Sequence, residues 1–230
     1  YVGSNNINLF KPNGQFGTRM QGGADSASER YIFTQLNPIT RHLFPASDDP
    51  IIDYNFDDGV RVEPEFFVPI IPMVLVNGAL GIGTGFSTQV LCYNPIDIVK
   101  LLICKLRVFT GVVYNDVYFP STNEYAEKYG ESDVSTIPLY EDGEHPIDFD
   151  IVPYYRDFKG EVVRLNKDTY IIRGVYEIEN HNVVHITELP VGVWTDTYKQ
   201  YLEKQIPHKI KEYNDMSTDK KVDIRITFVK

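Results

Sequence analysis

"GQFGTRMQGGADSASERYIFTQLNP" (residues 14–38) is the stretch that decides how this chain is interpreted. Its first half is rich in Gly and Ser, which is typical of loops whose backbone takes positive φ or approaches a ligand closely. Behind this loop, Arg30 stands directly before Tyr31 and places a permanent cation beside a phenol. If the pair met a phosphodiester, Tyr31 could attack phosphorus while the Arg30 guanidinium stabilised the developing oxyanion.

The dipeptide alone does not decide the matter. A phenol has a pKa near 10, so its attack needs cationic help or a base. The chain holds 16 tyrosines, and most Arg-Tyr neighbours in proteins are structural. His42 is close to Tyr31 in sequence, but on the helix expected at 37–44 it is interpreted as structural rather than as that base.

Composition excludes a disordered chain and argues against a simple nucleic-acid binder. With 43% hydrophobic residues the chain can bury a sizeable core, while its net charge of -10 is opposite to the usual nucleic-acid footprint. The charge is uneven, however, since residues 1–45 hold four bases against two acids. Residues 110–150 hold one base, Lys128, and ten acids: Asp116, Glu124, Glu127, Glu131, Asp133, Glu141, Asp142, Glu144, Asp148 and Asp150.

A second glycine-rich stretch, "NGALGIGTGFS" (77–87), admits two interpretations. It is no dinucleotide-binding fingerprint, because Gly85 follows Gly83 too soon for GxGxxG. The stretch could be a tight glycine turn under apolar strands. Alternatively, its small residues could press against a ligand, and Ile82 between glycines would be unusual in core packing.

Local patterns predict an α+β fold. Helices are expected at 37–44, 94–109 and 194–206, and a strand at 31–36. Two short strands should flank the turn Asp57-Asp58-Gly59, three strands should fill 160–190, and one should close the chain at 221–230. Cys92 and Cys104 are expected to be thiols, although a disulfide between them is possible.

Four motifs in order resemble type IIA DNA topoisomerases of the eukaryotic and large-DNA-virus branch. They are "GQFGTRMQGGADSASERYIFTQLNP" (14–38), "RVEPEFFVPIIPMVLVNGALGIGTGFS" (61–87), "YYRDFKGEV" (154–162) and "ITELPVGVWTDTYK" (186–199). The resemblance covers nearly the whole chain except the acidic block 110–150. The sequence "SASER" before Tyr31 differs from that of the animal enzymes and favours a viral member.

This resemblance implies roles for particular residues. Tyr31 would be the nucleophile, Arg30 its oxyanion partner, and Ile82 the apolar wedge that bends the duplex between base steps. The further DNA contacts predicted are Lys11, Gln15, Arg19, Gly83 and Thr84. Trp194 is interpreted as a structural anchor of its helix. The family's Mg²⁺ and ATP would be bound by modules absent from this chain, whose acids offer no convincing metal pair.

The family also implies a domain plan and partners. Residues 1–109 would form a winged-helix-type DNA-cleavage domain, 110–150 an acidic insertion or excursion, and 151–230 part of an α+β tower domain. The parent would be an intracellular homodimer acting on double-stranded DNA, nuclear if cellular and in host cytoplasm or nucleus if viral. We expect a fragment without a membrane span, inactive alone. The rival hypothesis is a non-catalytic DNA-binding or scaffolding domain.

Overall fold

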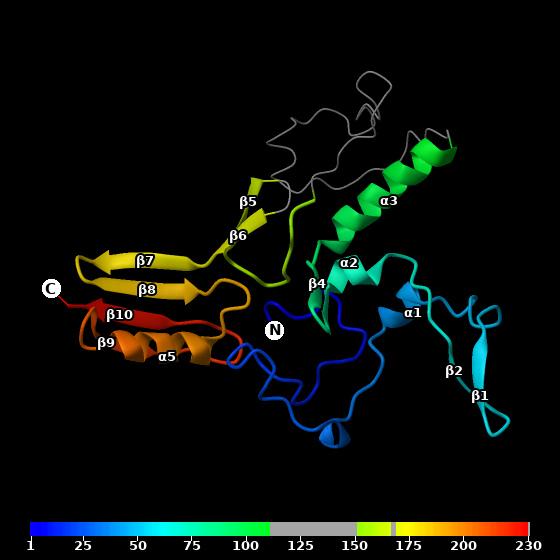
Figure 1. The fold of residues 1–230 in the computed structure, drawn as a ribbon, viewed down its shortest axis with the longest axis horizontal. Coiled ribbons are helices and arrows are strands. Elements are labelled where there is room, and N and C mark those ends of the chain that lie inside the picture. The colour runs from blue at the N-terminus through cyan, green and yellow to red at the C-terminus, as the bar shows by residue number, and fades with distance from the viewer. Residues whose placement is uncertain (111–150, 167–168, 230) are drawn as a thin grey trace. The chain divides into compact units, whose positions relative to one another are not determined.

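The computed structural model describes residues 1–110, 151–166 and 169–229, and it confirms a mixed helix and sheet architecture of α+β class (Figure 1). Packing divides the chain into two compact units. One joins Tyr1–Asn94 with Val152–Lys230, and the other is Pro95–Ile151. Compactness and family domain boundaries are different criteria, so the predicted division at 109 and 150 stays a prediction.

The largest sheet has four antiparallel strands in the order β7-β8-β10-β9. Their bounds are Val175–Asn180 (β7), Val183–Glu188 (β8), Ile210–Asp215 (β9) and Ile224–Phe228 (β10). Helix α5 (Thr195–Gln205) lies along this sheet (Figure 1). Between them lies the core cluster of Ile186, Leu189, Leu202, Ile210, Val222, Ile224 and Ile226.

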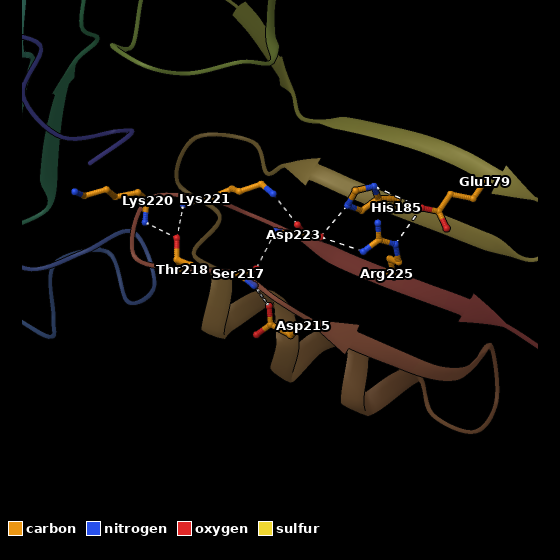
Figure 2. Close-up of polar contacts among 9 residues, drawn as sticks. All are labelled: Glu179, His185, Asp215, Ser217, Thr218, Lys220, Lys221, Asp223 and Arg225. Atoms are coloured by element: carbon orange, nitrogen blue, oxygen red, sulfur yellow. Dashed lines mark hydrogen bonds and ion pairs between the residues drawn. The ribbon is translucent and has the colours of Figure 1, made fainter.

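Strand alternation separates this core from a polar network (Figure 2). Ile224 and Ile226 of β10 are buried, whereas Arg225 between them donates from Nε to Glu179 Oε1 at 3.0 Å. Asp223 Oδ1 lies 2.9 Å from His185 Nε2, and its Oδ2 accepts from Lys221 Nζ at 2.7 Å. Hydrogen bonds between polar side chains therefore connect β7, β8 and the start of β10.

The C-terminal half holds more strands than the sequence predicted. Residues 160–190 form four strands rather than three, because β5 (Glu161–Asn166) and β6 (Thr169–Arg173) pair as a separate hairpin before β7. The break falls at Gly174, where a Cβ atom would collide with the Glu188 carbonyl. Strand β9 was not predicted, while α5 and β10 lie where the sequence indicated.

The N-terminal half consists of short elements. They are the 3-10 helix η1 (Glu29–Tyr31), the helices α1 (Thr40–Leu43) and α2 (Met73–Asn77), and two hairpins. The first hairpin, β1 (Tyr54–Asp57) with β2 (Val60–Pro64), turns at Asp58 and Gly59 as predicted. The second pairs β3 (Ala79–Gly83) with β4 (Phe86–Val90). The strand predicted at 31–36 is wrong, since that segment has a single bridge, Phe10 to Leu36.

Asn6 holds distant parts of the first unit together. Its buried amide Nδ2 lies within hydrogen-bond distance of the carbonyls of Val76 (2.9 Å), Tyr93 (3.2 Å) and Tyr154 (3.0 Å). Its Oδ1 accepts from the Arg156 amide at 2.8 Å. A buried amide with its donors and acceptor satisfied stabilises one arrangement of these segments over others.

Helix α3 (Pro95–Thr110) confirms the helix predicted at 94–109. Except for Thr110, the acidic block 110–150 lies outside the described residues. The Cys104 side chain is likewise not described, so the prediction of a thiol there stays a prediction. Cys92 is a free, buried thiol. In the described part of the chain, no helix combines the length and apolar character needed to cross a bilayer.

Candidate functional site

Tyr31 ends the short helix η1 and is 67% exposed. The guanidinium carbon of Arg30 lies 5.0 Å from the centre of the Tyr31 ring. Among the described residues, none forms a hydrogen bond with the Tyr31 hydroxyl, so the phenol is open to an external reactant. The predicted pair is therefore brought together in space, with both side chains exposed.

The glycine segment (residues 14–28) closes on itself before it reaches Tyr31. Asp25 accepts from the Thr18 hydroxyl at 2.6 Å and from the Thr18 amide at 2.8 Å, and these bonds lower the pKa of the Asp25 carboxyl. The Gly23 amide donates to the Thr18 carbonyl at 2.9 Å, and the Ala27 amide to the Gln15 carbonyl at 3.0 Å. The segment is an ordered loop rather than a flexible tether.

Two glycines in this segment are required by close packing. Gly17 has φ of +87°, and a Cβ there would lie 2.5 Å from Gly23 Cα. Gly22 has φ of +63°, and its backbone presses against the indole of Trp194. A larger residue at either position would displace the loop, which explains why both are glycine. Trp194 anchors this contact, in agreement with its predicted structural role.

Lys11 precedes this loop in the chain, and Gln15 lies within it. The Lys11 amide donates to the Gln35 carbonyl at 2.9 Å, and its Nζ lies 3.4 Å from Gln35 Oε1. The Gln15 side chain is exposed. The Lys11 side chain thus lies near the segment that follows Tyr31, and the DNA contacts of Lys11 and Gln15 stay a prediction.

Arg19, also predicted as a DNA contact, has its side chain buried in an ion pair. Its side chain is 6% exposed, and Nη2 lies 2.5 Å from Oε1 of Glu188, which is 2% exposed. While this pair persists, the Arg19 guanidinium cannot meet a phosphate at the surface. The sequence could not reveal this, because the two residues are far apart along the chain.

The β3–β4 hairpin presents Ile82, Gly83 and Thr84 to solvent. Ile82 is 87% exposed, and a Cβ on Gly81 would meet no neighbour within 4 Å. These glycines are thus not filling a packed core, which argues against a turn buried under apolar strands. No hydrogen bond or ion pair of the described residues joins this hairpin to the glycine segment.

Sequence reasoning missed other residues of this region. Phe33, two residues after Tyr31, is 86% exposed and lies in the segment 31–36, for which the sequence predicts a strand. Asp25 and Glu188 organise the loop through contacts that no local motif announces. His42 is exposed on α1, and its function stays open to test.

The described residues do not gather a metal-binding set. No group of three His, Cys, Asp or Glu side chains among them could hold an ion. We therefore assign no step of any reaction to a metal on these residues.

Comparisons with known proteins find relatives of the whole chain. The structure superposes on a Plasmodium falciparum topoisomerase II DNA-binding, cleavage and re-ligation domain with a TM-score of 0.74 and 34% identity, over 100% of this chain and 27% of that one. The chain is 44% identical to DNA topoisomerase 2 of Arabidopsis thaliana over 97% of its length. It is 42% identical to DNA topoisomerase 2-alpha of Sus scrofa over 95%.

The fold thus corresponds to the class of topoisomerase II DNA-binding, cleavage and re-ligation domains. The family model for the A-type subunit of DNA gyrase/topoisomerase IV matches residues 1–230, and the chain belongs to this family. The chain spans 13% of the Arabidopsis relative and 12% of the pig relative. These relatives are cellular proteins, so the expectation of a viral source has no support.

Proposed function

We propose that this chain is the nucleophile-bearing part of an ATP-dependent type II DNA topoisomerase. The observation that carries the proposal is the exposed Tyr31 with Arg30 beside its ring, on a chain that matches the family over its whole length. In this function one DNA duplex is cut on both strands, a second duplex passes through, and the break is resealed.

The cleavage step follows from the chemistry of the phenol. Tyr31 Oη forms a bond to a backbone phosphorus, and the bond from that phosphorus to the 3′-oxygen of the neighbouring nucleotide breaks. The phenolic proton leaves Tyr31, and the departing 3′-oxygen takes up a proton. The product is a 5′-phosphotyrosyl ester, and the reverse attack by the 3′-hydroxyl reseals the strand. Arg30 stabilises the charge that develops on the phosphate oxygens.

The remaining chemistry belongs to modules outside this chain. Magnesium, when bound by such a module, would stabilise charge on the reacting phosphate, and ATP turnover elsewhere would drive the gate motions. Each Tyr31 would work with the metal-binding module of a partner subunit, so the parent enzyme would be a homodimer. On this view the chain alone does not relax supercoils.

The domain plan is part of the same proposal. Residues 1–109 correspond to a winged-helix-type cleavage domain and residues 151–230 to part of a tower. The enzyme is proposed to act in the nucleus, where double-stranded DNA of chromosomes is its substrate. A relative from Dictyostelium discoideum is named as mitochondrial, which makes that compartment the alternative to exclude by localisation of a tagged full-length protein.

The rival function is a DNA-binding or scaffolding domain without chemistry. A scaffold has no need for an exposed tyrosine beside an arginine together with an exposed Ile82. It would bind DNA without forming a covalent bond. The two functions therefore differ in one measurable product.

The test is Tyr31→Phe in the full-length protein, assayed by trapping covalent protein–DNA complexes with detergent. The change removes only the attacking oxygen, so we expect adducts to disappear while folding and DNA affinity persist. Tyr176→Phe is the matched control, because Tyr176 is 65% exposed and lies on the distant strand β7. Undiminished adducts from the Tyr31 variant would refute this nucleophile, whereas the rival function predicts that the wild-type protein forms no adducts at all.

A further inference from the structure

Arg19 and Glu188 form the buried ion pair that connects the glycine segment to the C-terminal sheet. Glu188 is the last residue of β8, and its Oε1 lies 2.5 Å from Arg19 Nη2. Both side chains are nearly inaccessible to solvent. Two charges removed from water are tolerated only when good geometry and further hydrogen bonds compensate their desolvation.

Glu188 has those further hydrogen bonds. Its Oε1 also accepts from the Leu189 amide at 3.0 Å, and its Oε2 from the Lys159 amide at 3.3 Å. The carboxylate thus receives donors from the glycine segment, from the residues before β5 and from the end of β8. Such a site is specific for an anion. A neutral or a longer side chain in place of Glu188 would therefore lose some of these contacts.

The backbone beside Arg19 makes a second connection, to the start of α5. The Arg19 carbonyl accepts from the Thr195 amide at 3.4 Å, and the Met20 carbonyl from the Asp196 amide at 3.0 Å. Helix α5 has no side-chain cap at Trp194, so the glycine segment supplies acceptors for its first amides. The ion pair holds Arg19, and these backbone bonds hold Arg19 and its neighbour Met20.

Hydrogen bonds continue from this anchor toward Tyr31. Thr18 is bonded to Gly23 and Asp25, Gln15 to Ala27, and the Tyr31 amide donates to the Ser28 carbonyl at 2.9 Å. The Tyr31 ring contacts Arg30, its own chain neighbour, and its hydroxyl has no protein partner among the described residues. The position of the phenol is therefore set by the loop that carries it.

We propose that Arg19 and Glu188 are positioning residues for the nucleophile. The buried pair fixes the glycine segment against the end of β8 and the start of α5, and through that segment it fixes Tyr31. This inference rests on the proposed function. It assigns Arg19 to alignment of the attacking oxygen in place of a phosphate contact, and it gives the C-terminal sheet a part in strand cleavage.

The experiment measures two quantities on the full-length enzyme: the rate of covalent adduct formation at saturating DNA, and the Kd for the same DNA. Arg19→Met and Glu188→Gln should slow adduct formation by about 100-fold, the loss that a displacement of about 1 Å causes at a reacting centre. The Kd should stay close to the wild-type value, because Arg19 does not reach the DNA. A weakened Kd with an unchanged rate at saturation would overturn the proposal and restore Arg19 as a DNA contact.

The double variant Arg19→Met/Glu188→Gln separates positioning from stability. Removing both charges avoids an unpaired buried ion, so the melting temperature should recover relative to either single variant. The adduct rate should stay low, because the loop has lost its anchor. If the rate recovered together with the melting temperature, the pair would be merely structural and the inference would fail.

One control and two further variants complete the design. Glu161→Gln breaks the exposed pair of Glu161 with Arg173, whose atoms lie 3.5 Å apart, and should change neither quantity. Should Arg19→Met fail to fold, Arg19→Lys keeps the charge but lacks the planar fork, and it should still slow adduct formation with faster amide exchange in 14–31 and 194–198. A wild-type rate in Arg19→Lys with faster exchange there would refute the coupling. Tyr31→Phe separates failure of the proposed function from failure of the positioning role, because adducts that persist in this variant refute Tyr31 as the nucleophile.

Discussion

The guanidinium carbon of Arg30 lies 5.0 Å from the centre of the Tyr31 ring, and both side chains are exposed. A cation held against the ring is already near the oxygen that would attack, and its planar fork suits phosphate oxygens. In the proposed function the pair would be a preassembled nucleophile and charge stabiliser, and its two members can be tested separately.

We expect Arg30→Ala to slow strand cleavage by about 100-fold, which corresponds to about 3 kcal/mol for one lost oxyanion donor. Tyr31 keeps its oxygen, so slow adduct formation should persist. Arg30→Lys should recover part of the rate, because a point charge lacks the fork. Single-turnover cleavage measures the effect. Arg61→Ala is the control, since Arg61 also stacks on a tyrosine, 3.9 Å from the Tyr54 ring centre, and should cleave normally.

Ile82→Ala should reduce DNA bending and cleavage more than DNA binding. Phosphate contacts dominate affinity, whereas an apolar wedge is needed to unstack a base step. Fluorescence energy transfer across a short duplex measures the bend. Phe86→Ala is the control: Phe86 is 85% exposed against 87% for Ile82, and the register Ile82↔Ser87, Gly83↔Phe86 puts it on the opposite face. A wild-type bend in the Ile82 variant would contradict the wedge.

Sequence-local signals predicted most elements of this fold. The turn Asp58-Gly59 and helices α3 and α5 follow from turn chemistry and helical spacing over a few residues. The break at Gly174 depends on the Glu188 carbonyl, a contact invisible to local patterns. Strand β9 has exposed charged residues and lies at the sheet edge, so it lacks the apolar alternation that predicts a strand.

The candidate site likewise has one part that the local sequence predicts and another that depends on tertiary contacts. Arg30 and Tyr31 are chain neighbours, so their proximity required no knowledge of the fold. The family resemblance predicts Arg19 as a DNA contact, and only its tertiary partner Glu188 shows that its side chain is buried. The charge of a residue predicts which kinds of group it can bind, but only the fold determines which of those groups it contacts.

The polar network on the sheet predicts a pH dependence of stability. Hydrogen bonds from Lys221 and then His185 lower the pKa of Asp223 below its ordinary value of 3.8. Arg225 Nη1 also faces this carboxylate at 3.5 Å, and Glu179 bonds the other side of that guanidinium. A depressed pKa means that ionised Asp223 stabilises the fold above its unfolded pKa, and that this contribution is lost as pH falls through the folded pKa.

Asp223→Asn should therefore lower the melting temperature at about pH 7 and about pH 5 by a similar amount. At about pH 3 the difference from wild type should shrink, because the wild-type carboxylate is then becoming protonated. Thermal unfolding followed by circular dichroism measures this. Asp219→Asn is the control, an exposed aspartate to which the described residues make no ion pair, and it should show no such trend. A difference that grows toward low pH would contradict the assignment.

The acidic block 110–150, almost all of which lies outside the described residues, permits an electrostatic prediction. Ten acids against one base would repel DNA if they lay along the cleavage groove, with the largest effect at low salt. We predict that the block projects away from Tyr31, as exposed like-charge runs usually do. Replacing 115–145 with a short Gly/Ser linker should then leave cleavage intact and change the salt dependence of DNA binding little.

The measurement is the Kd for a short duplex over a series of salt concentrations, with cleavage assayed in parallel. An acid far from the groove adds nothing to the number of counterions released, so the slope of log Kd against log salt should match the wild type. Screening makes the opposite arrangement easy to recognise. If the deletion tightened binding strongly at low salt and the gain vanished at high salt, the acids would lie near the groove. The block would then act as an electrostatic gate on DNA entry.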